Sequence, residues 1–438
     1  MIALLRRLVP RSWFPTYHFI LARLAAFVYR YPSEELIVIG VTGTNGKTTT
    51  SYLIAKALES AGVKTGCTST AILKIGDKEW INPTKMTMPG RFFLQKMLRQ
   101  MVKAGCKYVV IETSSQGLIQ SRHEGISYDM AVFTNLTPEH IEAHGGFEAY
   151  KLAKKTLFTH VARRHAKHVQ GKEVPRTFVL NADSEHASFY TEAPTKDVHI
   201  AWYSRIGTKG LHPDECHLTD KGTDLVVDEN YGHLRLPGTY NVENALAALV
   251  VAKEFGVSVG DALQNICAVS YVPGRFEEVD LGQAFRVVID YAPEPESLRQ
   301  LYGALRLSPR RRLIHVLGSC GGGRDIARRP ILGEMAAKEA DLVIVTNEDP
   351  YDDDPRQIMN DVAAGAESAG KILGKNLWIV EDRKEAIKQA VMMAGSEDVV
   401  LLTGKGAELR ICVANGEKLP WNERSAAEEA IRARQVSV

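Results

Sequence analysis

The segment 36–50 constrains the fold of this chain most, because a short apolar strand runs into a glycine-rich loop and then into the start of a helix. Its residues are Leu-Ile-Val-Ile-Gly-Val-Thr-Gly-Thr-Asn-Gly-Lys-Thr-Thr-Thr. Backbone N–H groups of such a loop and of the helix N-terminus point into one concavity, which suits phosphate. Lys47 can reach the β- and γ-phosphates of a nucleotide, and the Thr48 hydroxyl can bind Mg²⁺. The segment therefore predicts a nucleotide site rather than a simple tight turn.

The spacing of this loop differs from the common pattern G-x-x-x-x-G-K-[ST]. That pattern would place glycine at position 41, where Val41 stands, and the glycines here are Gly40, Gly43 and Gly46. A helix after the loop is supported by apolar residues at helical spacing, namely Leu53, Ile54, Ala57 and Leu58.

Length and composition exclude several classes of protein. A chain of 438 residues suggests about three domains. A net charge of +2, without basic runs among aromatic residues, argues against nucleic acid as a partner. The six cysteines lie far apart without a C-x-x-C pair, which excludes a zinc ribbon or a disulfide framework and fits a reducing cytoplasm. We expect no spanning helix and no signal peptide.

Residues 1–35 predict an amphipathic helical segment. Phe14, Tyr17, Leu21, Leu24, Phe27 or Val28, and Tyr31 share one helical face, with arginines nearby. The face either packs on the domain that follows or lies on a membrane surface as a peripheral contact.

The rest of the chain predicts two α/β domains. Residues 36–272 alternate short apolar strands with helices, as a doubly wound ATP-binding domain does, with strands expected at 36–40, 108–112, 131–134 and 177–180. A β-rich excursion is expected within 160–235. Residues 273–438 repeat the alternation as a Rossmann-like domain, with strands expected near 286–290, 313–317, 342–346, 377–380 and 399–402.

Polar residues follow the strands of the first of these domains. Glu112-Thr-Ser-Ser115 follows one strand, Thr134-Asn135 the next, and Asn181-Ala-Asp183 the last. Ligands of an open parallel sheet bind beyond the carboxyl ends of its strands, so we expect these residues to converge beside the phosphate loop.

Several motifs in a fixed order give the chain a specific resemblance. From about 36 to 425 the sequence resembles the Mur ligases, and within them the UDP-N-acetylmuramoyl-tripeptide synthetase branch. The motifs are TGTNGKTTT, E-x-S-S, F-T-N-L-T-x-x-H-x-x-x-H-G-x-x-E-x-Y-x-x-A-K-x-x-L-F, N-A-D, G-x-Y-N-x-x-N-x-x-A-A, P-G-R-F-E, D-Y-A-x-x-P-x-S-L, R-D-x-x-x-R-P and G-K-G-x-E.

The resemblance implies amide-bond formation driven by ATP. A substrate carboxylate would attack the γ-phosphate, and an amino group would then attack the acyl phosphate. Like charges meet in the first step, so cations must neutralise the attacking and leaving oxygens. The resemblance implies two Mg²⁺ ions for this purpose, with Lys47 and Asn135 at the phosphates.

The same resemblance implies the ligands of the ions. Thr48 would hold the first ion, and Glu112 and His140 the second. Lys154, carbamylated by CO₂, would complete the second site, because an unmodified lysine would repel the metal. The register of A-K-x-x-L-F selects Lys154 over its neighbour Lys155.

The resemblance also implies binding residues for the nucleotide and for the substrates. The nucleotide residues are Gly43, Thr44, Asn45, Gly46, Lys47, Thr48, Thr49, Asn241, Asn244, Arg275, Asp290 and Tyr291. The substrate residues, for a muramoyl peptide and a free amino acid, are Thr87, Met88, Pro89, Ser114, Ser115, Arg324, Glu348, Asp349, Tyr351, Gly404 and Glu408. We expect a monomer.

The sequence departs from the family pattern in three places. Only about 35 residues precede the phosphate loop, where the family carries a UDP-binding domain, so the acceptor could be UDP-linked or lipid-linked. Pro293 and Ala407 stand where histidines are usual. Tyr351 replaces the arginine that diaminopimelate-adding members use, and the acidic residues Glu348, Asp349, Asp352, Asp353 and Glu408 suit a cationic side chain, lysine before ornithine.

Two other functions remain open at this point. One is a ligase acting on a non-peptidoglycan acceptor, as in polyglutamate or cyanophycin synthesis, which Thr87-Met-Pro-Gly90 disfavours. The other is an inactive ATP-binding scaffold, which the intact Lys47, Glu112, His140 and Lys154 disfavour.

Overall fold

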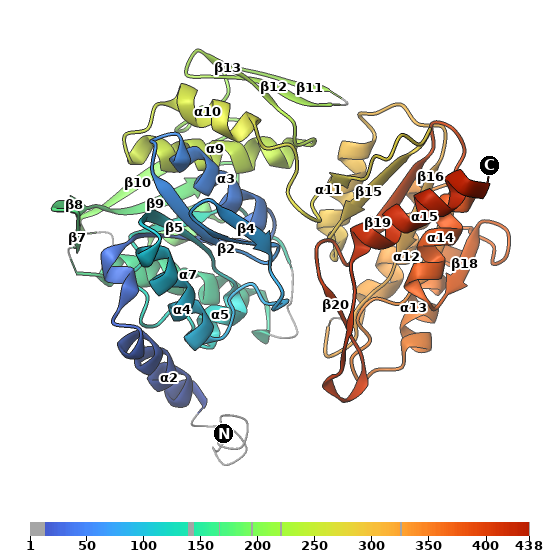
Figure 1. Ribbon diagram of the computed structural model, residues 1–438, viewed down its shortest axis with the longest axis horizontal. Coiled ribbons are helices and arrows are strands. Elements are labelled where there is room, and N and C mark those ends of the chain that lie inside the picture. The colour runs from blue at the N-terminus through green and yellow to red at the C-terminus, as the bar shows by residue number, and fades with distance from the viewer. Residues whose placement is uncertain are drawn as a thin grey trace.

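The computed structural model describes residues 14–138, 144–165, 167–193, 196–219, 221–324 and 326–437. Within these residues the strands form two large sheets, and each sheet is the centre of one lobe (Figure 1). The predicted fold class is confirmed: a doubly wound α/β lobe with the phosphate loop precedes a Rossmann-like α/β lobe.

The sheet of the first lobe has the order β10-β9-β6-β1-β5-β2-β3-β4. It is parallel from β10 to β2, and β3 and β4 add an antiparallel edge. Its strands are β1 (Ile37–Thr42), β2 (Lys64–Thr68), β3 (Ile72–Ile75), β4 (Lys78–Ile81), β5 (Cys106–Glu112), β6 (Met130–Phe133), β9 (Arg176–Asn181) and β10 (Val198–Tyr203).

Helices cover both faces of this sheet and bury two apolar clusters. On one face lie α3 (Lys47–Glu59), α9 (Thr239–Glu254) and α10 (Val259–Cys267). On the other lie α4 (Arg91–Lys103), α5 (Ser115–Ile119), α7 (Phe147–Arg163) and α8 (Ala187–Thr191).

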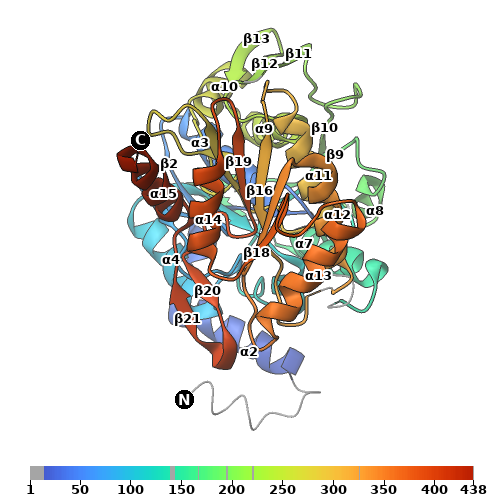
Figure 2. The same ribbon diagram turned by 90° about the vertical axis from the view of Figure 1, so that its right-hand side faces the viewer.

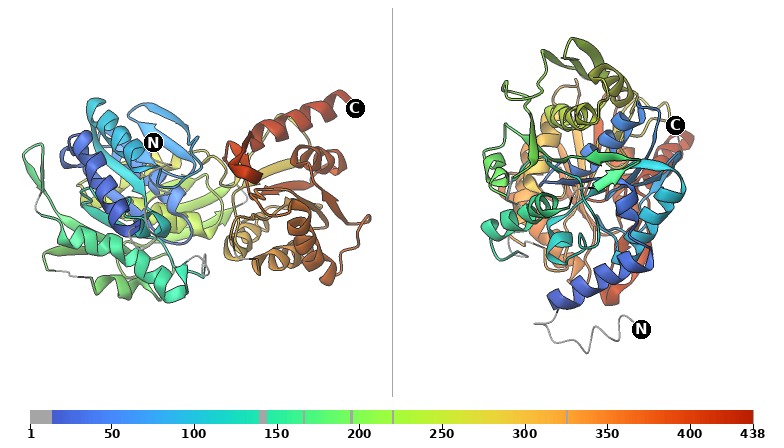
Figure 3. Two further views of the ribbon diagram at one scale, coloured as in Figure 1. Left: turned by 90° about the horizontal axis from the view of Figure 1, so that it is seen from below. Right: turned by 90° about the vertical axis from the view of Figure 1, so that its left-hand side faces the viewer.

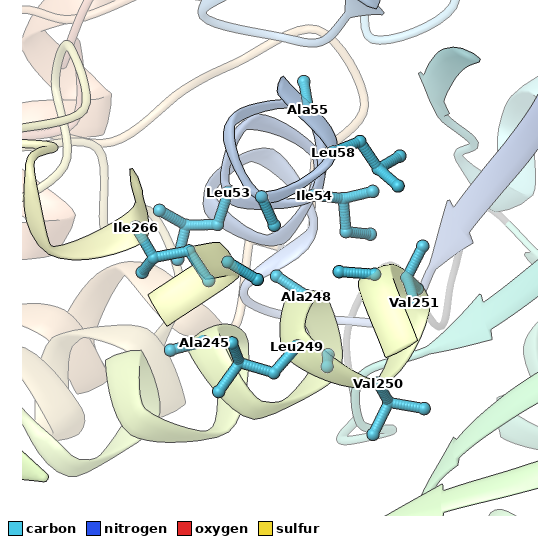
Figure 4. Close-up of a cluster of buried hydrophobic side chains, with 14 of the residues drawn as sticks. Leu53, Ile54, Ala55, Leu58, Ala245, Ala248, Leu249, Val250, Val251 and Ile266 are labelled. Atoms are coloured by element: carbon cyan, nitrogen blue, oxygen red, sulfur yellow. The ribbon is translucent and has the colours of Figure 1, made fainter. Parts of the chain in front are cut away.

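The packing of α3 on α9 fixes the helix that follows the phosphate loop. Leu53, Ile54 and Leu58 of α3 face Ala245 and Ala248 of α9, and all five side chains are fully buried (Figure 4). Alanines keep the helix axes close, because they fill little space between them. The apolar spacing that predicted α3 therefore corresponds to its buried face.

The β-rich excursion predicted within 160–235 is also confirmed. The hairpin β7 (Lys167–Val169) and β8 (Lys172–Val174) opens it. An antiparallel three-stranded sheet of β11 (Glu215–Thr219), β12 (Gly222–Val227) and β13 (Asn230–Leu234) closes it at the top of the first lobe (Figure 1).

The sheet of the second lobe has the order β14-β15-β19-β16-β17-β18. It is parallel except for the short β14. Its strands are β14 (Glu277–Glu278), β15 (Arg286–Asp290), β16 (Leu313–Leu317), β17 (Leu342–Thr346), β18 (Leu377–Val380) and β19 (Val399–Thr403).

Helices again cover both faces, as Figure 2 shows with this lobe toward the viewer. One face carries α11 (Pro295–Leu305), α12 (Arg328–Glu339) and α13 (Pro355–Ser368). The other carries α14 (Arg383–Met393) and α15 (Glu423–Ser437), and a small hairpin is formed by β20 (Arg410–Cys412) and β21 (Lys418–Pro420).

The N-terminal helix α2 (Phe14–Val28) packs differently from our expectation. It projects from the lower end of the first lobe, followed by a 3-10 helix at Pro32–Glu35 (Figures 1 and 3). Its buried side chains are the small Ala22, Ala25 and Ala26, whereas Leu24 is 44% and Phe27 66% exposed. Of the two expectations for the apolar face, packing on the domain that follows is wrong: alanines allow close approach, and the large apolar side chains face outward. Contact with a membrane surface stays a prediction. Among the described helices none is long and apolar enough to cross a membrane.

Candidate active site

The sharp turns of the phosphate loop require glycine at two positions. Gly43 has a φ of 152° and Gly46 a φ of 80°, values that favour glycine. A Cβ atom at Gly43 would lie 1.9 Å from Thr134 Oγ1. The loop therefore lies directly against the end of β6, and a side chain at this position would push it away.

Asn135 holds the phosphate loop through two hydrogen bonds. Its Oδ1 accepts a hydrogen bond from the Asn45 N–H at 2.9 Å, and its backbone oxygen accepts from Thr44 N–H at 2.9 Å. Lys47 Nζ donates to Thr44 O at 2.5 Å, so the ammonium lies over the loop. The predicted convergence of strand ends is confirmed here, since β1, β5 and β6 all deliver polar residues to this edge.

Oxygen ligands gather next to the loop. Thr48 Oγ1 donates to Glu112 Oε2 at 3.0 Å, and Thr70 Oγ1 donates to Glu112 Oε1 at 3.0 Å. Glu112 is nearly fully buried. Hydroxyl and carboxylate oxygens are the ligands that Mg²⁺ prefers, so this corner fits a magnesium ion. His140 lies outside the described residues.

Lys154 and Lys155 of α7 reach different surroundings. Lys154 is 1% exposed, and its Nζ donates to Gly43 O at 2.7 Å and lies 4.1 Å from the centre of the Tyr150 ring. Lys155 Nζ instead pairs with Glu192 at 3.0 Å. Only Lys154 of the two reaches the phosphate loop.

The nucleotide residues predicted on α9 and in the linker between the lobes, residues 271–277, also meet the loop. Thr50 Oγ1 donates to Asn244 Oδ1 at 2.9 Å, and Asn244 Nδ2 donates to Asn241 Oδ1 at 3.0 Å. Arg275 Nη2 lies 3.3 Å from Thr48 Oγ1, and its guanidinium stacks 4.7 Å over the Tyr291 ring.

Asp290 holds the linker against the second lobe. Its Oδ2 accepts from Phe276 N–H at 2.7 Å and its Oδ1 from Ala292 N–H at 2.8 Å. Burial raises the pKa of Asp290, and Arg275 opposes that rise. The Asp290 side chain therefore fixes the backbone at Phe276 and Ala292 next to the wall of the cavity.

The acceptor residues form the other end of the site. Thr87 Oγ1 lies 2.8 Å from Thr70 Oγ1, which joins Thr87 to the magnesium corner. Ser114 caps α5 by accepting from Gly117 N–H at 3.2 Å, and Arg122 donates to the backbone oxygen of Met88.

A cavity of about 480 Å³ unites these groups between the two lobes. Most predicted residues line it, and the family departure Pro293 lines it too. The predicted residues in its wall are Thr44, Asn45, Gly46, Lys47, Thr48, Thr49, Thr87, Met88, Glu112, Ser114, Ser115, Lys154, Asn241, Asn244, Arg275, Asp290, Tyr291, Arg324, Tyr351 and Glu408. The predicted and described residues that do not line it are Gly43, Pro89, Asn135, Glu348, Asp349 and Gly404.

The acidic lining expected at 348–353 is therefore different in the structure. Glu348 is buried and accepts from Cys320 Sγ at 2.8 Å. Asp353 accepts from Gly322 N–H at 3.2 Å, and Asp352 accepts from Asn415 N–H at 2.8 Å. Of the expected acidic residues, only Glu408 lines the cavity directly within the described chain.

An acidic corner nevertheless exists, formed by Asp349 and Glu408 with two lysines of the chain. Lys405 Nζ lies 3.0 Å from Asp349 and 2.7 Å from Glu408. Lys85, from the first lobe, pairs with Asp349 and lies 3.1 Å from Glu408. Burial alone would lower the pKa of Lys85, but Glu408 and Asp349 outweigh it and raise the pKa.

Our sequence reasoning missed Lys85, Thr70 and Tyr240, which all line the cavity. Lys85 and Thr70 belong to no motif that we recognised, whereas Tyr240 is the tyrosine of G-x-Y-N-x-x-N-x-x-A-A, to which we had assigned no role. Lys85 stands two residues before Thr87, in a loop after β4. It contacts Asp349 of the second lobe, which is 264 residues away in the sequence. No local signal could have found it.

Two α/β lobes that close a phosphate loop, an oxygen-rich metal corner and an acidic corner around one cavity define an ATP-dependent enzyme that joins a carboxylate to an amine. Residues 41–252 match the Mur ligase middle domain, and residues 274–406 match the family described as Mur ligase, glutamate ligase domain. The chain belongs to the Mur ligase family, and it is an ATP-dependent ligase.

Curated relatives support this assignment along most of the chain. The chain is 38% identical over 429 residues to UDP-N-acetylmuramyl-tripeptide synthetase of Roseiflexus sp., covering 97% of this chain and 84% of the relative. It is 36% identical over 421 residues to UDP-N-acetylmuramoyl-L-alanyl-D-glutamate–2,6-diaminopimelate ligase of Geobacillus kaustophilus, covering 94% and 82%.

Solved structures agree on the fold. A structure of a UDP-N-acetylmuramoyl-L-alanyl-D-glutamate–2,6-diaminopimelate ligase is 28% identical with a TM-score of 0.61, covering 94% of this chain and 82% of that one. Folylpolyglutamate synthase of Mycobacterium tuberculosis complexed with ADP is 17% identical with a TM-score of 0.67, covering 89% and 92%. At that identity the second match shows the fold alone.

Proposed function

We propose that this ligase adds a free amino acid with a cationic side chain, lysine before ornithine, to the carboxylate of a muramoyl peptide in peptidoglycan precursor synthesis. The observation that carries the side-chain choice is the acidic corner. Lys85 places an ammonium between Asp349 and Glu408, beside Tyr351. A corner that accepts the ammonium of a chain lysine suits the ammonium of a substrate lysine.

The names of the relatives support the acceptor. One relative is a muramyl-tripeptide synthetase, and another is named for adding diaminopimelate to a muramoyl dipeptide. Diaminopimelate carries a second carboxylate. Once Lys85 has left the corner, Asp349 and Glu408 outnumber Lys405 and repel that carboxylate. Lys85 and Arg324 line the same cavity and are cations that act in the opposite direction.

The chemistry follows from the positions of the groups around the phosphate loop. The acceptor carboxylate attacks the γ-phosphate, and ADP leaves as the acyl phosphate forms. The amino group, after losing a proton, then attacks the acyl carbon, and phosphate leaves with formation of the amide. Lys47 and the loop N–H groups neutralise the phosphate oxygens in the first step. Closure between the lobes excludes water, which would hydrolyse the acyl phosphate.

Magnesium would supply charge neutralisation between the phosphates and the attacking carboxylate. Thr48 would hold the first ion, and we assign Glu112, His140 and a carbamylated Lys154 to a second ion. The hydrogen bond of 3.0 Å between Thr48 and Glu112 supports two neighbouring ions. The position of Lys154 supports this, since its Nζ is buried beside the loop, where an uncompensated cation would oppose a metal.

We assign residues 36–272 to ATP binding, residues 273–438 to the incoming amino acid, and residues 1–35 to a separate N-terminal segment. The enzyme would work in the cytoplasm as a monomer. We favour a UDP-linked acceptor because both named relatives carry that group in their names.

A lipid-linked acceptor is favoured by one observation on α2. Its outward face exposes Phe19, Ile20, Leu24, Phe27 and Val28, and Arg23 lies beside them. Such a face with basic residues suits contact with an anionic membrane surface. Sedimentation with anionic vesicles tests this: Phe27→Ser with Leu24→Ser should abolish binding, and equal binding of this variant would exclude the helix as the contact.

One assay separates the candidate functions. The protein is incubated with ATP, UDP-muramoyl-dipeptide and single amino acids, and phosphate release is measured. Amino-acid-dependent release supports the ligase; release without a muramoyl acceptor but with polyglutamate indicates another acceptor; no release under any condition indicates a scaffold. Competition of equimolar lysine, ornithine and meso-diaminopimelate, read by product mass, then identifies the side chain. Diaminopimelate as the main product would overturn our choice.

A further inference from the structure

A second cluster of potential metal ligands lies away from the cavity, on the first lobe. One ligand atom each of His123, Glu124 and His160 lie within 4.8 Å of one another. His123 and Glu124 are in the turn after α5, and His160 is on α7. His123 is 5% exposed, and the other two side chains are half-buried. The ligand atoms are therefore sheltered by the protein but reachable from solvent.

His160 is oriented as metal-binding histidines commonly are. Its Nε2 lies 2.8 Å from the backbone oxygen of Ile126. A carbonyl oxygen only accepts, so Nε2 carries the proton and the lone pair remains on Nδ1. Donation of one ring N–H to a backbone carbonyl typically fixes a histidine whose other nitrogen binds a metal.

Glu124 divides its two oxygens between two partners. Oε1 lies 3.6 Å from His123 Nε2, while Oε2 lies 3.2 Å from Arg23 Nη2. Two ligands at about 2.1 Å from one ion with a tetrahedral angle lie about 3.4 Å apart, close to the first of these distances. An ion can therefore take Oε1 while Arg23 stays on Oε2.

Ring packing alone explains only part of this arrangement. The rings of His123 and His160 meet edge-to-face with centroids 5.2 Å apart, which is ordinary aromatic contact. Packing does not account for the carboxylate facing His123.

We propose that His123, Glu124 and His160 bind one divalent transition-metal ion of the Zn²⁺ type, with water in the remaining position. Two imidazoles and one carboxylate suit zinc, cobalt or nickel, whereas Mg²⁺ prefers oxygen ligands. The site joins the 123–126 turn to α7. The same turn lies against α2, because a Cβ atom at Gly125 would meet Ala26 Cβ at 2.8 Å. The ion fastens the turn to α7, and α2 supplies no ligand.

Cobalt titration of the full-length protein, with excess Mg²⁺ to fill the oxygen-rich corner, tests the site. Visible absorption should show one Co²⁺ bound per chain, displaced by Zn²⁺. His123→Gln and His160→Gln should each weaken binding roughly tenfold or more. His199→Gln is the matched control, because His199 pairs with Glu254 at 3.2 Å outside any three-ligand cluster of the described residues.

Two further measurements separate loss of the metal site from loss of the fold. Far-ultraviolet circular dichroism without metal verifies that each variant folds, and Glu124→Gln replaces any variant that does not. Zinc should raise the melting temperature of the wild type but not that of His160→Gln. Unchanged cobalt affinity in His123→Gln, absence of binding, or only a thiolate charge-transfer band from the Cys320, Glu348 and Asp349 cluster would overturn the proposal.

Discussion

Lys154 and Lys155 show how one position along a helix decides a chemical role. A helix turns by about 100° per residue, so neighbouring side chains point to different surroundings. Sequence alone allowed the choice only through a motif register. The structure adds a physical reason, since Lys154 is buried at Gly43 O and Lys155 pairs with Glu192 on the surface.

We predict that Lys154→Ala lowers kcat roughly a hundredfold or more, because the second ion loses a ligand. Short carboxylates such as formate or acetate should partly restore turnover by supplying the missing oxygen atoms. Lys155→Ala is the control and should keep near-normal turnover in the phosphate-release assay. Loss of activity in Lys155→Ala, with an active Lys154→Ala, would show that our register is wrong.

His315 is a residue whose burial makes stability depend on pH. Its ring nitrogens lie 2.8 Å from Tyr302 Oη and 2.9 Å from Thr403 Oγ1. Burial, followed by the charge of Arg383, lowers the pKa of His315 to about 3. The unfolded chain binds this proton below about pH 6.5 and the folded chain does not, so stability falls as the pH drops from 6.5 toward 3.

We predict that the free energy of unfolding of the wild type falls by about 2 kcal/mol from pH 7 to pH 5 because of His315 alone. His315→Gln cannot titrate and can still bond to Tyr302 and Thr403, so its decline should be smaller by that amount. Urea unfolding at pH 5, 6 and 7 measures the difference. Parallel pH curves for the two proteins would contradict the assigned pKa.

At the scale of elements, the sequence predicted strands with long apolar runs well and the others poorly. Strands β15 to β19 match their predicted ranges within a residue, because runs such as Val399–Thr403 are apolar and end at turns. The strands β2, β3 and β4 were missed: β2 and β3 are largely buried but short and contain lysine, and Lys78 and Glu79 of β4 are exposed. One of the two expectations for α2 was wrong, because its large apolar residues do not pack on the domain and its alanines do.

The close contact of α12 with α13 depends on glycine. A Cβ atom at Gly365 would lie 1.9 Å from the backbone oxygen of Pro330, so a methyl group would force the helices apart. In contrast, a Cβ atom at Gly303 of α11 would meet no other atom within 4 Å. These two helical glycines should respond oppositely to the same substitution.

We predict that Gly365→Ala destabilises the protein by about 2–4 kcal/mol, because overpacking outweighs the helix propensity of alanine. Gly303→Ala should be neutral or stabilise by up to about 1 kcal/mol. Urea unfolding measures both values, as the change in the free energy of unfolding of the second lobe. A stabilising Gly365→Ala would mean that the helices can separate without cost.

At the scale of the whole molecule, the acidic corner joins the lobes through Lys85. Its ammonium occupies the place that we assign to the side chain of the incoming amino acid. A cationic substrate must therefore displace Lys85. The chain lysine then acts as an internal competitor.

We predict that Lys85→Met lowers the KM for lysine roughly tenfold while the KM for ATP stays unchanged, because the competitor is removed. Lys64→Met is the control, since Lys64 forms an exposed pair with Asp77 far from the cavity. Initial-rate kinetics with varied lysine and ATP measure both constants. A higher KM for lysine in Lys85→Met would show that Lys85 helps to bind the substrate.

The linker between the lobes belongs mechanically to the second lobe. Tyr291 N–H donates to Gly274 O at 2.9 Å, Phe276 N–H donates to Asp290, and Glu277 pairs in β14 with Ile289. Any hinge must therefore lie upstream of Gly274, and Arg275 must travel with the second lobe. Since Arg275 reaches Thr48 across the cavity, hinge opening would dismantle the ATP site as well as widen it. Product release and loss of nucleotide contacts would then be one motion.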